Sequence, residues 1–95
     1  MRVEKAQIDF LKSEINKEDQ SAEVYLFGSR TDDRKKGGDI DILILSKKKV
    51  SPVSLAKIKA RFYQHFGERK IDMVNYTYDQ SSAFRELIME DSVRL

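Results

Sequence analysis

The segment from residue 39 to residue 45, DIDILIL, carries two carboxylates within an otherwise apolar run. Successive side chains of a β-strand point to opposite faces, so Asp39 and Asp41 would share one face with their Cα atoms about 6.6 Å apart. Ile40 and Ile42 would then point into the core. Burying an unpaired carboxylate is unfavourable, whereas Mg²⁺ binds oxygen ligands and keeps waters and substrate phosphates in its shell. The pattern therefore predicts either a divalent cation site or an exposed strand end.

A third carboxylate, Asp72, is flanked by apolar residues in the later segment KIDMV. If this segment forms a strand beside residues 39–45, Asp72 would join Asp39 and Asp41. Three carboxylates suffice for two metal ions, or for one metal ion and a general base. Paired metal ions stabilise the attacking and leaving oxygens in phosphoryl and nucleotidyl transfer.

The segment AEVYLF, residues 22–27, ends at Gly28-Ser29-Arg30. Glycine allows the backbone to approach a ligand closely, and the N–H groups at the start of a following helix donate hydrogen bonds to phosphate oxygens. The Ser29 hydroxyl and the Arg30 guanidinium would add donors. A phosphate-binding turn next to metal-binding carboxylates is the arrangement of a nucleoside triphosphate site, although each feature alone is common in ordinary turns and strands.

The elements that position these residues follow from the periodicity of apolar side chains. Helices are predicted at residues 3–18, 52–66 and 81–90, with a short helix or turn at 30–35, and strands at 22–27, 39–45 and 70–76. Gly67 is expected to end the second long helix, and Ser81 or Ser82 to cap the last one. In that last helix Phe84, Leu87 and Ile88 are expected to face inward. The order indicates an α/β (α+β) domain with a small mixed sheet flanked by helices.

The composition fits one domain spanning residues 1–95 with an apolar core and a charged surface. There is no cysteine, and no apolar run approaches the length of a membrane span, so we expect a cytoplasmic protein. The net charge of +2 gives no strong signal for nucleic-acid binding. Basic clusters at 34–36 and 47–49 would be solvated loops or, less favoured, a rim for a polyanion.

Together, Gly28-Ser29, a nine-residue spacer, Asp39-Ile40-Asp41 and the later Asp72 resemble the signature of the DNA polymerase beta-like nucleotidyltransferases. In size the chain resembles the minimal nucleotidyltransferase (MNT) proteins, which are antitoxins paired with HEPN-domain toxins. The resemblance implies the polymerase beta-like fold, with Gly28, Ser29 and Arg30 binding the phosphates of ATP. It also implies that Asp39, Asp41 and Asp72 bind Mg²⁺, and that Asp72 serves as the base for the incoming hydroxyl.

The same resemblance implies transfer of AMP from ATP to a tyrosine of a HEPN RNase toxin, and a hetero-oligomer with that toxin. The sequence departs from many relatives at Gly38, where serine is usual, and at Thr31, Asp32 and Asp33, where a small residue and a glycine are usual. Two alternatives stay open. The chain would act as a non-catalytic antitoxin that binds its toxin directly, or as a nucleotidyltransferase with a small-molecule or RNA acceptor.

Overall fold

The computed structural model describes residues 4–27, 40–67 and 70–95. Within them, three helices and four strands follow one another as α1 (Lys5–Glu18), β1 (Glu23–Phe27), β2 (Ile40–Ser46), α2 (Pro52–Phe66), β3 (Ile71–Thr77), α3 (Ala83–Glu90) and β4 (Val93–Arg94). This order confirms the predicted α+β class. The short helix or turn expected at 30–35 lies outside the described residues, and the two-residue strand β4 was not predicted.

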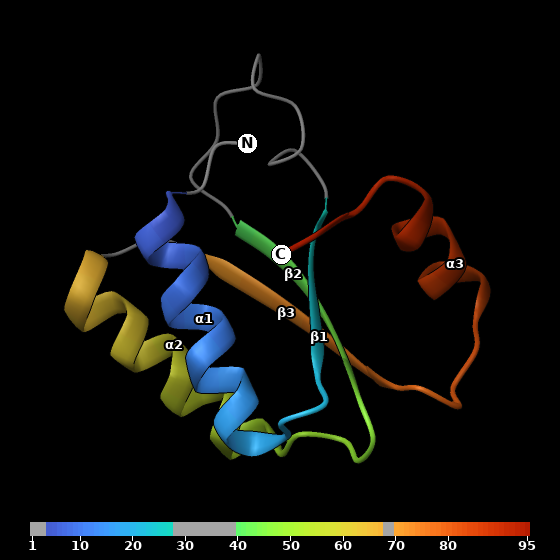
Figure 1. Cartoon of the computed structure of the whole chain (residues 1–95), viewed down its shortest axis with the longest axis horizontal. Coiled ribbons are helices and arrows are strands. Elements are labelled where there is room, and N and C mark those ends of the chain that lie inside the picture. Colours follow the sequence, from blue (N-terminus) through green and yellow to red (C-terminus); the bar gives the residue numbers. More distant parts are fainter. Residues whose placement is uncertain (1–3, 28–39, 68–69) are drawn as a thin grey trace.

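The four strands form one mixed sheet in the order β3-β2-β1-β4. β1 pairs antiparallel with both β2 and β4, whereas β2 pairs parallel with β3. A parallel pair needs a crossover connection, and α2 provides it. Figure 1 shows α1 and α2 side by side on one side of the sheet, with α3 standing apart on the other side.

Local sequence signals explain where α2 begins and ends. Ser51 caps its start, because the side-chain oxygen accepts a hydrogen bond of 3.1 Å from the Ser54 amide. Pro52 occupies the first turn, where its missing N–H costs nothing. Gly67 follows the last turn with φ at 85°, and its amide donates to the Tyr63 carbonyl at 2.9 Å. The expected glycine cap is therefore confirmed.

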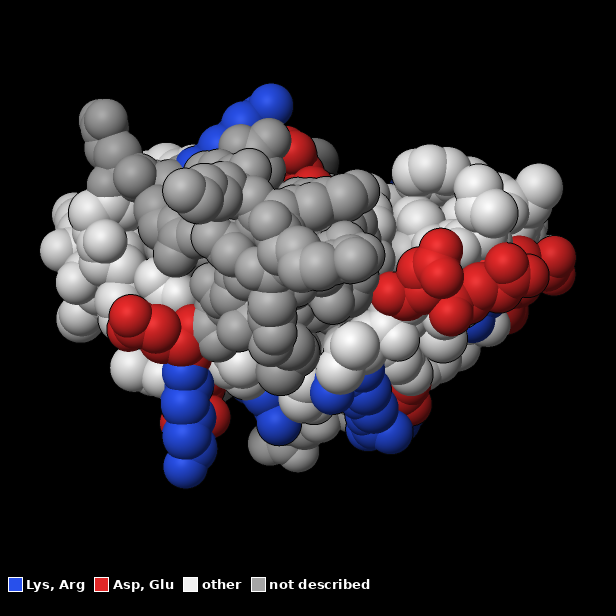
Figure 2. Space-filling model, turned by 90° about the horizontal axis from the view of Figure 1, so that it is seen from above, with Lys and Arg blue, Asp and Glu red and all other residues white. Residues whose placement is uncertain are grey.

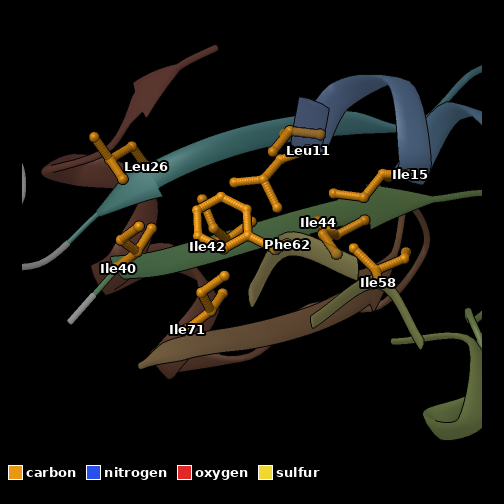
Figure 3. Packing of buried hydrophobic residues seen from close by; sticks show 10 residues of the cluster. Leu11, Ile15, Leu26, Ile40, Ile42, Ile44, Ile58, Phe62 and Ile71 are labelled. Carbon is orange, nitrogen blue, oxygen red and sulfur yellow. The ribbon is translucent and has the colours of Figure 1, made fainter. Parts of the chain in front are cut away.

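The main core lies between the sheet and the helices α1 and α2. Figure 3 shows side chains from α1 and α2 meeting those of the strands. The fully or almost fully buried members come from five elements and are Leu11, Ile15, Val24, Leu26, Ile40, Ile42, Ile44, Ile58, Phe62 and Ile71. The expected inward orientation of Ile40 and Ile42 is confirmed, since neither exposes any surface.

Contacts between α1 and α2 hold the two helices of this layer together. The ring of Phe10 packs edge-on against Phe62 with centroids 6.1 Å apart. Glu14 is almost completely buried and accepts hydrogen bonds from Lys17, at 2.7 Å, and from Arg61 of α2. These two cations lower the pKa of the Glu14 carboxyl, the hydrogen bond from Lys17 contributing most. The carboxylate therefore stays ionised and joins the two helices.

A second, smaller cluster covers the opposite face of the sheet. It consists of buried Leu43, Leu45 and Ile88, with the partly buried side chains of Tyr25, Phe27, Val74, Tyr76 and Met89 packed around them. Among the described residues, α3 is the one helix that contributes to this layer. One face of the sheet is thus covered by two long helices, and the other by an eight-residue helix.

The expectation that Phe84 and Leu87 face inward was wrong. Their exposed fractions are 54% and 63%, whereas Ile88 is 6% exposed, as expected. The reason is geometric: α3 contacts the sheet through the side that carries Ile88 and Met89, and a helix of eight residues offers the sheet only about two turns. Leu87 points away from the side between Ile88 and Met89, and Phe84, although it is four residues from Ile88, lies at the margin of that side.

Candidate active site

Alternation along β2 places Asp41 on the face of the sheet opposite α1 and α2. Ile40, Ile42 and Ile44 belong to the main core, whereas Leu43 belongs to the smaller cluster. Because side chains two residues apart share a face, Asp41 lies on the face of Leu43. The structure thus bears out the expectation that Asp41 and its neighbouring isoleucines point in opposite directions.

Asp72 reaches the same face from β3. Ile71 packs in the main core, and Val74 packs in the smaller cluster, so alternation puts Asp72 on the side of Val74. The parallel register pairs Asp41 directly with Asp72. Neighbouring strands lie about 4.8 Å apart, and both residues are partly exposed. The two residues are therefore neighbours on one face of the sheet.

The end of β1 lies next to Asp41. Phe27, the last residue of β1, is the antiparallel partner of Asp41. A row across three strands thus reads Phe27, Asp41, Asp72. The remaining predicted site residues, Gly28, Ser29, Arg30 and Asp39, lie outside the described residues. Within the described parts of the chain, no group of three or more His, Cys, Asp or Glu is suited to hold a metal ion.

Arg94 places a cation on this face of the sheet that the sequence pattern did not predict. Arg94 in β4 pairs with Tyr25 of β1, and paired residues of neighbouring strands project to the same face. Arg94 is exposed, so a positive side chain lies on the same face as the carboxylates, two strands from Asp41. The only sequence signal was a valine-arginine pair near the C-terminus, which is too short to predict a strand.

Tyr25 itself does not have the properties of a nucleophile. Its hydroxyl donates a 2.6 Å hydrogen bond to the Glu23 carboxylate. This hydrogen bond is the main reason that the pKa of Tyr25 is raised, with burial adding to it. The phenol therefore remains protonated at neutral pH. Its hydrogen bond joins the side chains of Tyr25 and Glu23 on one face of β1.

A hollow of about 410 Å³ lies at the opposite end of β2 from Asp41. It is lined by Glu18, Asp19, Val50, Ser51, Ser54 and the three lysines 47–49. The lysines are exposed, in agreement with the expected solvated loop. Asp19 accepts hydrogen bonds from the Ser21 hydroxyl and the Lys47 amide, both at 2.7 Å, and these lower its pKa. This hollow is separate from the carboxylate pair.

The carboxylate pair gives the chain a defined chemical capacity. Carboxylate oxygens are the ligands that Mg²⁺ prefers, and the pair lies on neighbouring strands of a sheet face that is only partly covered. The donor set therefore fits a divalent cation that also binds phosphate oxygens. The described parts of the chain contain no helix long and apolar enough to cross a bilayer.

The solved structures with a similar fold include toxin–antitoxin complexes. A toxin–antitoxin with AMP-PNP is 16% identical, with a TM-score of 0.72 over 97% of this chain and 72% of that chain. A mutant MntA-HpeT toxin–antitoxin is 17% identical, with a TM-score of 0.69. The match covers 98% of this chain and 71% of that chain. A complex of tri-AMPylated Shewanella oneidensis HEPN toxin with MNT antitoxin is 16% identical, with a TM-score of 0.57. The match covers 90% of this chain and 69% of that chain. At these identities the likeness concerns the fold.

The family comparison goes further than the fold. The comparison with curated proteins found no match. The family model described as "Polymerase beta, Nucleotidyltransferase" matches residues 9–95, which include every predicted site residue, most of α1 and every later element through β4. The family expected from the Gly-Ser and Asp-x-Asp pattern is therefore confirmed. The chain belongs to the polymerase beta nucleotidyltransferase family.

Proposed function

We propose that this nucleotidyltransferase transfers AMP from ATP, with Mg²⁺, to a tyrosine hydroxyl of a HEPN-domain RNase toxin, and so acts as the antitoxin. The observation that carries the proposal is the pairing of Asp41 with Asp72 on the less covered face of the sheet. The family match supports nucleotidyl transfer. The similar complexes, which contain toxins, antitoxins, AMP-PNP or an AMPylated HEPN toxin, support the acceptor and the nucleotide.

In this proposal, Asp39, Asp41 and Asp72 hold the metal. Asp39 precedes the first residue of β2 in the chain and is assigned from its two-residue spacing to Asp41. Bound Mg²⁺ would neutralise charge on the phosphates of ATP and position them. Gly28, Ser29 and Arg30 follow the last residue of β1, the neighbour of β2, and are assigned to the triphosphate.

The transfer step is a displacement at the α-phosphorus of ATP. The tyrosine oxygen forms a bond to that phosphorus while the bond to the pyrophosphate oxygen breaks, and pyrophosphate leaves. Asp72 accepts the proton of the hydroxyl, as a carboxylate general base. The product is a tyrosine carrying AMP through a phosphodiester bond.

The decisive experiment combines this chain with Mg²⁺, ATP and the product of the neighbouring gene, tested as the HEPN-domain partner. Intact mass spectrometry of the partner should show a gain of one or more AMP units. The Asp41→Asn variant should give no gain, while Asp9→Asn, a matched change at an exposed position of α1, should behave like the wild-type protein.

Two other results are informative. A stable complex that silences the toxin without any mass gain would replace this proposal with the non-catalytic antitoxin. AMP appearing on RNA or on a small molecule, with the partner unmodified, would instead favour the third reading of the sequence.

A further inference from the structure

Helix α3 presents an apolar pair that the fold does not use. Phe84 and Leu87 are 54% and 63% exposed, and residues three apart on a helix lie on the same side. The inward contacts of α3 come from Ile88 and Met89. We call Phe84 and Leu87 the apolar pair of α3. Two large apolar side chains at helical spacing on so short a helix form a candidate contact surface.

The apolar pair is held on a well-anchored helix. The Ser82 side chain caps α3 by accepting a 3.0 Å hydrogen bond from the Arg85 amide. The Arg85 guanidinium donates to the carbonyls of Tyr78 and Gln80 in the preceding loop. These bonds fix the start of the helix, so the apolar pair is already oriented for a partner, and less entropy is lost on binding.

The apolar pair has acidic neighbours on α3 and just after it, which we call the acidic rim. Glu86, Glu90 and Asp91 are exposed on or just after α3, and the one basic residue between positions 79 and 91, Arg85, is engaged in the bonds just described. Figure 2 shows the acidic side chains gathered at the α3 end of the molecule. This local charge is negative although the whole chain carries +2.

The charge decides which class of partner fits this surface. Nucleic acids and anionic membranes bind positively charged protein surfaces. The carboxylates beside the apolar pair would repel both, which excludes them as partners of this surface. A protein surface with an apolar centre and a rim of lysine and arginine is complementary in both respects. Such a basic rim is what an RNA-binding protein presents.

The position of α3 connects this surface to the carboxylate pair. Ile88 of α3 packs against Leu43 and Leu45, which lie on the same face of β2 as Asp41. A protein bound to the outer side of α3 would therefore lie beside the face on which Asp41 and Asp72 are exposed. It would not lie over α1 and α2, which cover the other face.

We propose that the apolar pair of α3, with its acidic rim, is the docking surface for the acceptor protein, whose matching surface is apolar and edged with basic residues. This inference rests on the proposed function. Docking on α3 holds the acceptor beside the sheet while its hydroxyl reaches the carboxylates, so binding and chemistry use separate residues of this chain.

The test compares Phe84→Ser/Leu87→Ser with Val53→Ser, a control whose side chain is 64% exposed on α2. Affinity for the purified HEPN-domain partner is measured by calorimetry, and AMP transfer by intact mass. The double variant should bind about 30-fold more weakly, the loss typical of a central aromatic contact. Its transfer at subsaturating partner should fall in parallel. The control should match the wild-type protein in both measurements, and all three should bind Mg²⁺ and ATP equally in a thermal-shift assay.

The acidic rim is tested by charge reversal. Glu86→Lys/Glu90→Lys should slow association with the partner at low ionic strength, and the difference should shrink as salt is added. Glu18→Lys, an exposed position at the end of α1, provides the matched control. Equal association rates for the rim variant and the wild-type protein would overturn the charge argument.

The remaining outcomes separate this inference from the proposed function. Unchanged affinity in Phe84→Ser/Leu87→Ser, with AMP transfer intact, would overturn the docking surface and leave the function standing. A wild-type protein that neither binds nor modifies the partner would overturn the function itself. If light scattering showed a dimer of this chain that the double variant dissociates, the pair would be covered by a second copy, and the docking inference would fail.

Discussion

Asp72 illustrates how one residue acquires a role from its neighbours. Alone, it is a carboxylate between two apolar residues, a pattern that is equally common at strand edges. In the structure it is the register partner of Asp41 and shares its face of the sheet. A carboxylate that is partly exposed and next to a second carboxylate is placed both to bind a cation and to accept a proton.

Replacing Asp72 with asparagine should therefore stop catalysis without unfolding the chain. The side chain is partly exposed and asparagine keeps its shape, so the melting temperature should stay close to that of the wild-type protein. The rate of AMP transfer should fall by about 10²- to 10⁴-fold, the usual contribution of general base catalysis. Initial rates from intact mass would measure this, with Asp9→Asn as the control. A folded Asp72→Asn protein with wild-type rate would remove Asp72 from the mechanism.

The sequence predicts which residues belong to the site better than it predicts which of them lie next to one another. Asp41 follows from the two-residue alternation of DIDILIL, a local property. The pairing of Asp41 with Asp72 does not, because the register depends on how the α2 crossover packs on the sheet. Phe84 and Leu87 were misplaced for a related reason: their spacing predicts an apolar helix side, but sequence does not say which part of that side the sheet covers. Gly28, Ser29, Arg30 and Asp39 remain predictions.

At the scale of an element, Gly67 determines where α2 ends. Its backbone has φ at 85° and ψ at 176°, a combination that is almost confined to glycine. An added Cβ would meet nothing within 4 Å, so any cost of substitution comes from the backbone alone.

Gly67→Ala should accordingly destabilise the fold by about 1–3 kcal/mol, the usual cost of holding a residue in such a conformation. Urea denaturation would measure the free energy of unfolding. Gln64→Ala, an exposed change near the end of the same helix, should be close to neutral. If Gly67→Ala also left the free energy of unfolding unchanged, α2 would have to end in another backbone conformation without loss of stability.

The Glu14 carboxylate joins α1 to α2, and its contribution should depend on pH. Since the folded state lowers its pKa below the ordinary value of 4.5, the stabilisation is fully present above that value. It is lost as the pH falls through the lower pKa of the folded state.

Glu14→Gln should thus cost about 1.5 kcal/mol at pH 7, a value at the low end for charged hydrogen bonds because Lys17 and Arg61 are largely exposed. The difference from the wild-type protein should narrow as the pH falls below 4.5. Urea titrations at several pH values would show this, with Glu18→Gln as the exposed control. If the difference in the free energy of unfolding did not change with pH, the charge of Glu14 would play no part in stabilising the fold.

At the scale of the whole molecule, the two faces of the sheet are unequally covered. The main core under α1 and α2 holds most of the buried apolar side chains, whereas the carboxylate face has a smaller cluster under α3. We expect the bound nucleotide to add contacts on this second face, and so to stabilise the entire fold.

At about 100 times the dissociation constant, a ligand contributes about 2.7 kcal/mol to stability. For a domain of this size, that corresponds to an increase in melting temperature of about 10–20 °C. Thermal unfolding with Mg²⁺ and ATP should show the increase, and chelation of the metal should abolish most of it. Asp41→Asn should respond little to the metal. An increase that is identical with and without Mg²⁺ would contradict a carboxylate-bound metal.

The parallel pairing of β2 with β3 also has a consequence for protein synthesis. Residues of β1 and β2 leave the ribosome before those of β3, so the antiparallel pair that carries Asp41 can form before Asp72 emerges. The two carboxylates meet only after the α2 crossover has folded and β3 has joined the sheet, a non-local step. A nascent chain that stops before β3 therefore carries Asp41 without Asp72, and the appearance of metal binding would report that β3 has joined the sheet.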